Sequence, residues 1–509
     1  MGTGEVGIHR ARFAHRYELN RLLSKDTCPD GVLLGQRRDF LFFKRFVVVR
    51  PTKNRREIGN TLIVGPTRSG KGLLAVSQLL SWKHSVIVND IKGELFTATA
   101  GYRKQLGEVY VIDPAGVGHS FDPLLGKHTE DELYALASHL LFEADERERI
   151  FTQRATDMLT QMFLASRIEG IAPFLYTRFL IREGLSAAAG RLNQIDPSLA
   201  TQFLDMNFAD ASLSDRFLLS SWGTLKARMK PLITETLVRC LSGSSFTAEM
   251  LLRSDQPVTV YFRWPEQALL ALSPLVRLLW GSLINELIAT YDKNQGTGCK
   301  NVLLLIDEAG RTAIPSLADH ATTVVGRGIF LWVAIQSLSQ LEAVYGRARA
   351  QILKDNMETQ IYYRPSDLDT AEHLERCLGR HSAFAHSTTV REGEETSQGL
   401  SEQGIPLLTA QDIRQMHDED IIGFHRHLPP FMLKRVDWRH HTTLKQRRSM
   451  QAPQLAALPR TPDIPEHPGG SRTSQPKAAY IDPDMLHRSG EKTLIDLFRR
   501  EQAEDLSLH

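Results

Sequence analysis

The sequence predicts an α/β fold in which helices cover a parallel β-sheet, with an all-α insertion and a Pro-rich tail. Short apolar runs alternate with helical periodicity over residues 61–125 and 251–440, the pattern of parallel strands joined by right-handed crossovers. Between these segments, residues 126–250 keep helical periodicity and contain no strand-like run. From residue 441 to the end at residue 509, repeated prolines and Gly469-Gly470 predict a flexible tail.

Residues 1–60 form a short lead-in, which we expect to pack on the sheet domain rather than fold alone. Helical periodicity over Ala14–Leu23 predicts a helix, and Gly31–Leu34 and Phe46–Val49 predict short strands. Much farther along, the polar stretch Ala383–Ser401 contains glycines and several glutamates, and it predicts a loose loop.

The overall composition is that of a globular protein. The chain has 509 residues, 42% of them hydrophobic and 24% charged, and a formal net charge of only +2. Bulk charge therefore gives no indication of nucleic-acid binding, and the locally basic runs His9–Arg56 and Lys434–Arg448 are interpreted as solvated surface. Four cysteines without a C-x-x-C pair or zinc spacing predict reduced thiols in a cytosolic protein.

The N-terminal residues do not have the pattern of a signal peptide, because basic residues interrupt every apolar run there. The longest apolar stretch of the chain, Ala268–Ala289, contains Pro274, Arg277 and Glu286. These residues predict an amphipathic core helix rather than a transmembrane one. We therefore expect a cytoplasmic protein.

The first strand of the sheet domain leads into a glycine-rich loop. The apolar run Leu62–Val64 precedes Gly65, and a helical run follows Lys71. Strand, glycine loop, lysine and helix form a P-loop, whose backbone N–H groups face a polyphosphate while the lysine contacts its β- and γ-phosphates. Gly72 replaces the usual Ser or Thr, so the hydroxyl that commonly binds Mg²⁺ is missing. The predicted nucleotide-binding residues are Gly65, Pro66, Thr67, Arg68, Ser69, Gly70, Lys71, Gly72 and Leu73.

A second strand ends in two adjacent acids. The apolar run Val302–Ile306 is followed directly by Asp307 and Glu308. Beside a P-loop, the first acid suits Mg²⁺ held through water, and the second suits a general base that activates water. The acid pair alone is a weak signal, but together with the P-loop it predicts ATP hydrolysis with ATP and Mg²⁺ as ligands.

Two further residues are candidates for catalysis. Gln336 follows the apolar run Phe330–Ile335, so its amide could sense the γ-phosphate; a simple helix N-cap by Ser337 is the alternative. Arg327 could act as an arginine finger on the ATP of a neighbouring subunit, with a purely structural turn as its alternative.

Taken together, these motifs resemble the TraG/TraD-type coupling proteins of type IV secretion and conjugation. The resemblance covers roughly residues 9–440. The motifs that carry it are GPTRSGKG at Gly65–Gly72, NDIKGELFTATAGYRKQLG at Asn89–Gly107, VYVIDP at Val109–Pro114, LLLIDEAG at Leu303–Gly310, GRGI at Gly326–Ile329, AIQSLSQLEAVYG at Ala334–Gly346 and SEQGIPLLTAQDI at Ser401–Ile413. Glycine after the lysine is common in that family, and Ile91 stands where the family tends to have proline.

The resemblance implies a RecA-like, DNA-translocating P-loop ATPase that assembles as a homo-hexamer. Its partners would be DNA with a relaxase or a secreted protein substrate, and the components of the type IV secretion channel. Family members usually begin with transmembrane helices, and this chain starts near where those would end. Three explanations are open. A partner brings the protein to the inner face of the cell membrane, the protein works as a soluble motor, or the chain is truncated.

Two alternatives remain open at this point. One is a soluble DNA translocase or helicase of the same fold with no link to secretion, because a fold alone does not fix a function. The other is a nucleotide-gated adaptor that recruits substrate and hydrolyses little ATP. Glu308 argues against the adaptor, since recruitment needs no general base.

Overall fold

The structure is a computed structural model. It describes residues 10–27, 29–38, 44–51, 57–141, 149–210, 215–311, 314, 317–389, 397–462 and 464. The chain divides into two compact units. The sheet unit comprises Met1–Tyr110, Ala248–Gln267 and Ile284–Gln454, and the helical unit comprises Val111–Thr247, Ala268–Leu283 and Leu455–His509.

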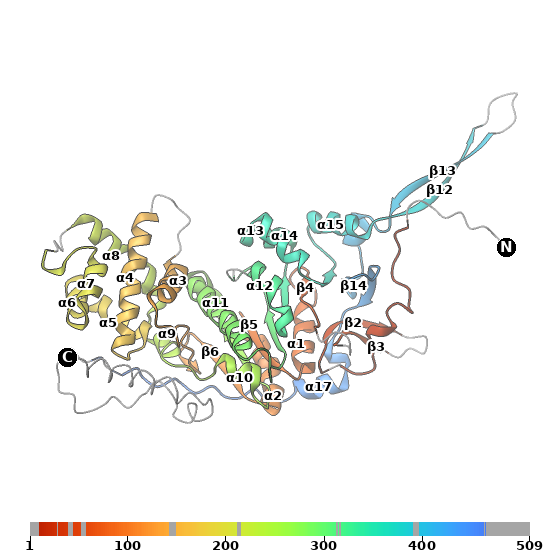
Figure 1. Ribbon diagram of the computed structural model, residues 1–509. Coiled ribbons are helices and arrows are strands. Elements are labelled where there is room, and N and C mark those ends of the chain that lie inside the picture. The colour runs from red at the N-terminus through yellow and green to blue at the C-terminus, as the bar shows by residue number, and fades with distance from the viewer. Residues whose placement is uncertain are drawn as a thin grey trace. The chain divides into compact units, whose positions relative to one another are not determined.

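Six parallel strands form the centre of the sheet unit (Figure 1). Their order is β11-β4-β10-β9-β5-β8. Nearly every residue in them is buried, which explains why they appear in the sequence as continuous apolar runs. The strands are β4 (Thr61–Val64), β5 (Ser85–Asp90), β8 (Thr259–Arg263), β9 (Val302–Ile306), β10 (Ile329–Ile335) and β11 (Thr359–Tyr363).

Antiparallel strands extend this sheet beyond β11 in the order β14, β15, β2, β3 and β1. The lead-in of the chain therefore pairs with its late strands, and the two strands predicted in the lead-in are confirmed. The bounds are β1 (Leu23–Ser24), β2 (Val32–Arg38), β3 (Lys44–Val49), β14 (Asp420–His425) and β15 (Phe431–Lys434).

Helices connect the parallel strands, as the alternating pattern predicted. Those of the sheet unit are α1 (Lys71–Ser81), α2 (Glu94–Leu106), α10 (Ala248–Arg253), α12 (Leu317–Thr323), α13 (Leu338–Tyr345), α14 (Arg347–Asp355), α15 (Leu368–Leu378), α16 (Ala410–Arg414) and α17 (Thr442–Arg448). Short 3₁₀ turns are η1 (Asn20–Leu22), η4 (Glu266–Ala268), η5 (Val325–Arg327) and η6 (Trp438–His440). The long helix α11 (Leu269–Lys293) begins in the helical unit and ends in the sheet unit.

Two local predictions are wrong. The described residues of the expected loop Ala383–Ser401 belong instead to two long antiparallel strands, β12 (Arg380–Thr389) and β13 (Ser397–Pro406), which project from the sheet unit in Figure 1. Residues 390–396 lie outside the described part of the chain. Main-chain hydrogen bonds pair these two strands in register over their whole length, so no apolar face was needed to form them. The helix expected over Ala14–Leu23 is only a turn followed by η1.

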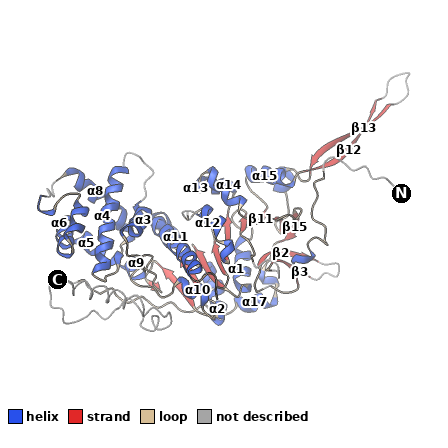
Figure 2. Ribbon diagram, in the orientation of Figure 1, coloured by secondary structure: helices blue, strands red, loops and turns tan. Residues whose placement is uncertain are grey.

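The helical unit contains a bundle of helices (Figure 2). It also contains one short strand pair, in which Ile112 and Asp113 pair with Gly118 and Val117. Apart from the first part of α11, its described helices lie in the interval 126–250 where we predicted the all-α insertion. They are α3 (Glu130–Leu141), α4 (Arg149–Ile168), α5 (Pro173–Glu183), α6 (Leu185–Ile195), α7 (Pro197–Leu204), η2 (Phe208–Asp210), α8 (Arg216–Met229), η3 (Lys230–Leu232) and α9 (Glu235–Cys240). The strands are β6 (Val109–Asp113) and β7 (Val117–Gly118).

The segment predicted as a flexible tail begins with ordered structure. Helix α17 packs against α1 and α2, and Arg447 donates to the carbonyl of Leu80 at 2.7 Å. Within the helical unit, Leu458 N–H donates to Gly116 O at 2.9 Å. Residues 465–509 lie outside the described part of the chain, and the prediction of flexibility stays open there.

One helix in the described part of the chain, Glu266–Lys293, is long and apolar enough to cross a membrane. Its most apolar window has a mean hydropathy of 1.5, and 61% of that window is buried within the protein. The core helix of a folded domain passes the same test, so this finding is weak support for a membrane span.

Candidate functional site

The carboxyl ends of three neighbouring strands bring the predicted motifs together. The register pairs Val64 of β4 with Ile335 of β10, and Val333 of β10 with Ile306 of β9. The P-loop, Gln336 and the acid pair therefore follow strand ends at one edge of the parallel sheet. This edge is where ligands bind in open α/β sheets.

Gly65 and Gly70 occupy positions that suit glycine, whereas a Cβ at Gly72 would meet no atom within 4 Å. A Cβ at Gly65 would lie 2.7 Å from Cβ of Tyr363 and 2.8 Å from Oγ of Ser69. Gly70 has φ +113°, a value that L residues rarely adopt, and helix α1 begins immediately after it. The loop therefore wraps closely around the site and presents the N-terminus of α1 to it, an arrangement suited to an anion.

Lys71 is buried and folds back onto its own loop. Its Nζ donates to the carbonyl oxygen of Pro66 at 2.9 Å and also to that of Gly65. Burial lowers the pKa of this amine, while Asp307 and Glu308 act in the opposite direction. The ammonium group thus lies in the field of both acids and has only backbone carbonyls as partners among the described residues.

The hydroxyl of Ser69 also fits a phosphate ligand. Its Oγ is buried, and no described residue serves as its hydrogen-bond partner. Such an orphaned group is costly unless a ligand or water satisfies it. Together with the closely wrapped glycines and the helix N-terminus, it shows that these residues fit a polyphosphate group.

Asp307 lies directly after β9. Burial and the neighbouring Glu308 raise the pKa of its carboxyl to about 6, and Lys71 opposes this shift. Asn89 fixes the backbone here, because its Nδ2 donates to Asp307 O at 3.0 Å while its Oδ1 accepts from Trp264 Nε1 at 3.1 Å. A divalent cation would relieve the clustered negative charge, so the residues fit Mg²⁺.

In the described part of the chain, no cluster of three or more His, Cys, Asp or Glu residues could hold a metal ion. Magnesium in nucleotide sites needs only one or two carboxylates, with phosphate oxygens and water completing its shell. Asp307 is sufficient by that criterion. The described cysteines, Cys240, Cys299 and Cys377, are free as predicted, and Cys28 lies outside the described residues.

Glu308 has a left-handed backbone conformation with φ +53°. Its carboxylate lies between two cations, at 3.5 Å from Lys92 Nζ and 3.3 Å from Arg311 Nη1. Arg311 also pairs with Glu266. A strained non-glycine residue at a strand tip is typical of functional sites, and here it turns the second acid away from the line of the strand.

Gln336 follows β10, and its backbone N–H donates to Oε1 of Gln340 at 3.1 Å. The N-cap role considered for this stretch is confirmed, because the Ser337 side chain caps α13 by accepting from Gln340 N–H. The side chain of Gln340 thus accepts a hydrogen bond from Gln336, and its backbone N–H donates one to Ser337. Both bonds fix the turn that positions Gln336. The role of Gln336 as a γ-phosphate sensor stays a prediction.

Arg327 is the one predicted site residue that the structure does not bring to this edge. It lies just before β10, next to the residues that begin β9, so the length of β10 separates it from the loop. Its guanidinium makes a bidentate pair with Asp292, with both N···O distances 2.8 Å, and its Nη1 donates to Thr323 O at 2.9 Å.

The structure adds residues that the sequence reasoning missed. Arg311 follows Glu308 by one helical turn and could have been identified from that spacing. Tyr363 and Arg435 reach the loop from 293 and 366 residues away along the chain, so no local signal could have identified them. A cavity of about 790 Å³ next to Pro66 is lined in part by Arg364 and Arg414.

The amino-acid sequence matches the family described as Type IV secretory system Conjugative DNA transfer over residues 18–460. Protein VirD4 of Rhizobium radiobacter is 27% identical over 412 residues, which cover 76% of this chain and 58% of VirD4. Conjugal transfer protein TraG of Escherichia coli is 27% identical over 399 residues, covering 70% of this chain and 62% of TraG. The chain thus spans about three fifths of the length of these relatives.

Solved structures of TrwB share the fold. The unbound bacterial conjugative coupling protein TrwBdeltaN70 has a TM-score of 0.62 at 15% identity, covering 86% of this chain and 96% of that chain. TrwB in complex with ADP and Mg²⁺ has a TM-score of 0.54 at 15% identity, covering 79% and 87%. The predicted α/β P-loop fold is therefore confirmed, and the length of the sequence match places this chain in the Type IV secretory system Conjugative DNA transfer family.

Proposed function

We propose that this protein is a coupling ATPase of type IV secretion, which binds ATP with Mg²⁺ and uses its hydrolysis to drive or gate substrate transfer. The observation that carries the proposal is the meeting of the P-loop with Asp307 and Glu308 across adjacent strand ends. The family membership supports the link to conjugative transfer. The solved TrwB complex with ADP and Mg²⁺ supports the choice of ligands.

The roles of the residues follow from their positions. The loop residues Gly65 to Leu73 would hold the phosphates through backbone N–H groups, and Lys71 would exchange its carbonyl partners for phosphate oxygens. Asp307 would hold Mg²⁺ through water. When bound, the metal neutralises charge on the β- and γ-phosphates. Glu308 would accept the proton of the attacking water, and Gln336 would sense the γ-phosphate.

Glu308 lies between two cationic neighbours, with its carboxylate 3.5 Å from Lys92 Nζ and 3.3 Å from Arg311 Nη1. A carboxylate in this position can accept the proton of the attacking water. The same neighbours hold it in place beside the acid of the metal site. This arrangement favours hydrolysis over the adaptor alternative, because a recruiting protein gains nothing from an oriented base.

The proposed partners are DNA with a relaxase or a secreted protein substrate, and the components of the secretion channel. We propose that the protein works at the cytoplasmic face of the cell membrane. The names of the curated relatives support a place in conjugal transfer. The family membership supports both kinds of substrate.

The decisive experiment measures nucleotide binding and ATP turnover with and without DNA. The wild-type chain should bind Mg·ATP and hydrolyse it faster when single- or double-stranded DNA is added. Lys71→Ala should lose binding itself, since it removes the phosphate-facing charge. Binding without any turnover, under all DNA conditions, would contradict the motor and favour the adaptor.

A finer part of the proposal concerns assembly. We propose a homo-hexameric ring in which Arg327 acts on the ATP of a neighbouring subunit, an effect of about 10³–10⁵-fold in related enzymes. To act in this way, Arg327 must leave Asp292, which now holds it in a bidentate pair. Asp292→Ala is therefore a matched control for Arg327→Ala, because both break the same ion pair.

If Arg327 is a finger, Arg327→Ala should abolish turnover while Asp292→Ala preserves most of it. Mixing Arg327→Ala with Glu308→Gln should restore some activity, since one interface can then combine an intact base with an intact arginine. Equal losses in both single variants, with no rescue on mixing, would show that the pair is only structural.

A further inference from the structure

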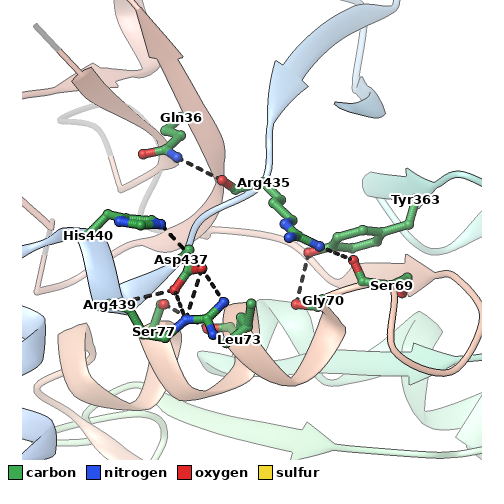
Figure 3. Close-up of polar contacts among 10 residues, drawn as sticks. All are labelled: Gln36, Ser69, Gly70, Leu73, Ser77, Tyr363, Arg435, Asp437, Arg439 and His440. Carbon is green, nitrogen blue, oxygen red and sulfur yellow. Dashed lines mark hydrogen bonds and ion pairs between the residues drawn. The ribbon is translucent and has the colours of Figure 1, made fainter. Parts of the chain in front are cut away.

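Arg435, a half-buried arginine that directly follows β15, lies on the P-loop (Figure 3). Nη1 of Arg435 donates to the carbonyl oxygen of Ser69 at 3.1 Å. A Cβ at Gly70 would come within 3.1 Å of Arg435 Cδ and 3.3 Å of its Nη1, so the side chain packs closely over this glycine. The guanidinium therefore touches the last two residues before the phosphate-facing lysine.

Tyr363 supports the same part of the loop from the end of β11. Its hydroxyl lies 3.5 Å from Gly70 O, and its ring is buried beneath Gly65 and Gly70. The aromatic ring and the guanidinium together leave the Ser69–Gly70 peptide little freedom to rotate. The left-handed conformation of Gly70 thus depends on contacts from outside the loop as well as on glycine itself.

The backbone of Arg435 is itself fixed on both sides. Its N–H donates to Glu419 O at 2.7 Å, and its carbonyl accepts from Nε2 of buried Gln36 at 2.8 Å. Gln36 Oε1 lies 3.1 Å from Nε2 of His441. Strand β2 of the lead-in and the segment after β15 therefore hold the arginine against the loop.

Most N–H groups of the Arg435 guanidinium have no hydrogen-bond partner among the described residues. Only Nη1 has a partner among the described residues, namely Ser69 O, although a guanidinium carries five N–H groups. Its positive charge lies beside a loop whose N–H groups face an anion. A charged group in that position both fixes the loop and strengthens its attraction for a phosphate.

We propose that Arg435 is a positioning residue of the nucleotide site, which holds the Ser69–Gly70 peptide in its phosphate-binding conformation and adds positive charge beside it. This inference rests on the proposed nucleotide binding and adds a residue of the basic run Lys434–Arg448, which was interpreted above only as solvated surface.

The test compares three substitutions in the full chain. Arg435→Gln removes the charge and shortens the donor, Arg435→Lys keeps the charge without the planar fork, and Arg439→Gln is the control. Arg439 lies four residues farther on, is exposed, and pairs with Asp437 at 2.6 Å rather than with the loop (Figure 3). The measurements are the Kd for Mg·ADP and Mg·ATP, and the melting temperature without nucleotide.

Arg435→Gln should raise both Kd values about 10-fold or more, as expected for loss of a charge-assisted hydrogen bond. Arg435→Lys should raise them less, and Arg439→Gln should leave them unchanged. The melting temperature of the ligand-free protein should fall by a similar small amount in Arg435→Gln and Arg439→Gln. A purely structural arginine would instead lower the melting temperature and leave the Kd values unchanged.

Nucleotide binding by the wild-type protein separates the role of Arg435 from the proposed function. Nucleotide binding by the wild type with unchanged affinity in Arg435→Gln overturns the role of Arg435 alone. No binding by the wild type overturns the proposed function together with this inference. A loss in Arg435→Gln that Arg435→Lys partly recovers supports both.

Discussion

Asp122 of the helical unit is fully buried and Asp307 of the sheet unit is half-buried, and the two acids differ in their partners. In the helical unit, Asp122 has no exposed side-chain surface, and its carboxylate is paired with Arg167 at 3.3 Å while Leu124 N–H donates to it at 2.9 Å. In the sheet unit, Asp307 has no cationic partner within salt-bridge distance among the described residues. Lys71, whose charge opposes the rise in the pKa of Asp307, donates its hydrogen bonds to backbone carbonyls instead.

The difference indicates what each set of charges is for. A buried acid that is paired and hydrogen-bonded stabilises one conformation, and removing its partner is costly. An acid that is left without a cation retains electrostatic energy that a ligand can release on binding. The charges of the helical unit are therefore structural, whereas those at the strand ends are arranged for a cation and a polyphosphate.

The largest effect on stability should come from the structural pair. Arg167→Leu would leave Asp122 buried and uncompensated, so we expect a loss of about 3–5 kcal/mol in the free energy of unfolding of the helical unit. Urea denaturation followed by circular dichroism would measure it. The double variant Arg167→Leu/Asp122→Leu should recover most of the loss, and no recovery would show that the pair is not what the single variant breaks.

A smaller effect of opposite sign is expected at the site. Asp307→Asn removes a carboxylate that has no cation within salt-bridge distance among the described residues and lies beside a second acid, so the metal-free protein at pH 8 should gain about 0.5–2 kcal/mol in unfolding free energy. The same variant should lose Mg²⁺-dependent nucleotide binding. A lower unfolding free energy in Asp307→Asn than in the wild type would contradict the view that the charge of Asp307 is uncompensated.

The smallest expected effect concerns pH. Burial, aided by nearby Arg277, lowers the pKa of His139 in the helical unit. Because the folded state then binds fewer protons than the unfolded state, this contribution to stability is present above the ordinary histidine pKa and is lost as pH falls through the lowered value. His139→Gln should therefore lose less stability than the wild type between pH 7.5 and pH 5.5. An equal loss in both proteins would assign the acid sensitivity elsewhere.

The sequence predicted the parts of the fold that depend on local pattern. Continuous apolar runs identified the parallel strands, because both faces of those strands are buried. The P-loop and the Asp307–Glu308 pair were identified because glycines, a lysine and acids occur at strand ends. Helical periodicity likewise located most helices of the insertion, but it missed α6 and predicted one helix over Leu213–Leu241, where the structure has α8, η3 and α9.

Features that depend on tertiary pairing could not be predicted. The hairpin β12–β13 is held by main-chain bonds between polar strands, so it carries no hydrophobic signal. Tyr363 reaches the P-loop because β11 pairs with β4, and Arg435 reaches it from the residue after β15, two strands farther along the sheet. Their sequence neighbours give no sign of these contacts. The pairing of Arg327 with Asp292 is equally invisible, since 35 residues separate them.

The central claim is that the acids at the strand ends perform hydrolysis rather than merely support the fold. Glu308→Gln tests it most directly, because the amide keeps the size of the side chain but cannot accept a proton. We expect Mg·ATP to bind to this variant with wild-type affinity, while DNA-stimulated turnover falls about 10²–10⁴-fold. Turnover at the wild-type rate in Glu308→Gln would contradict the assignment of the general base and, with it, this account of the site.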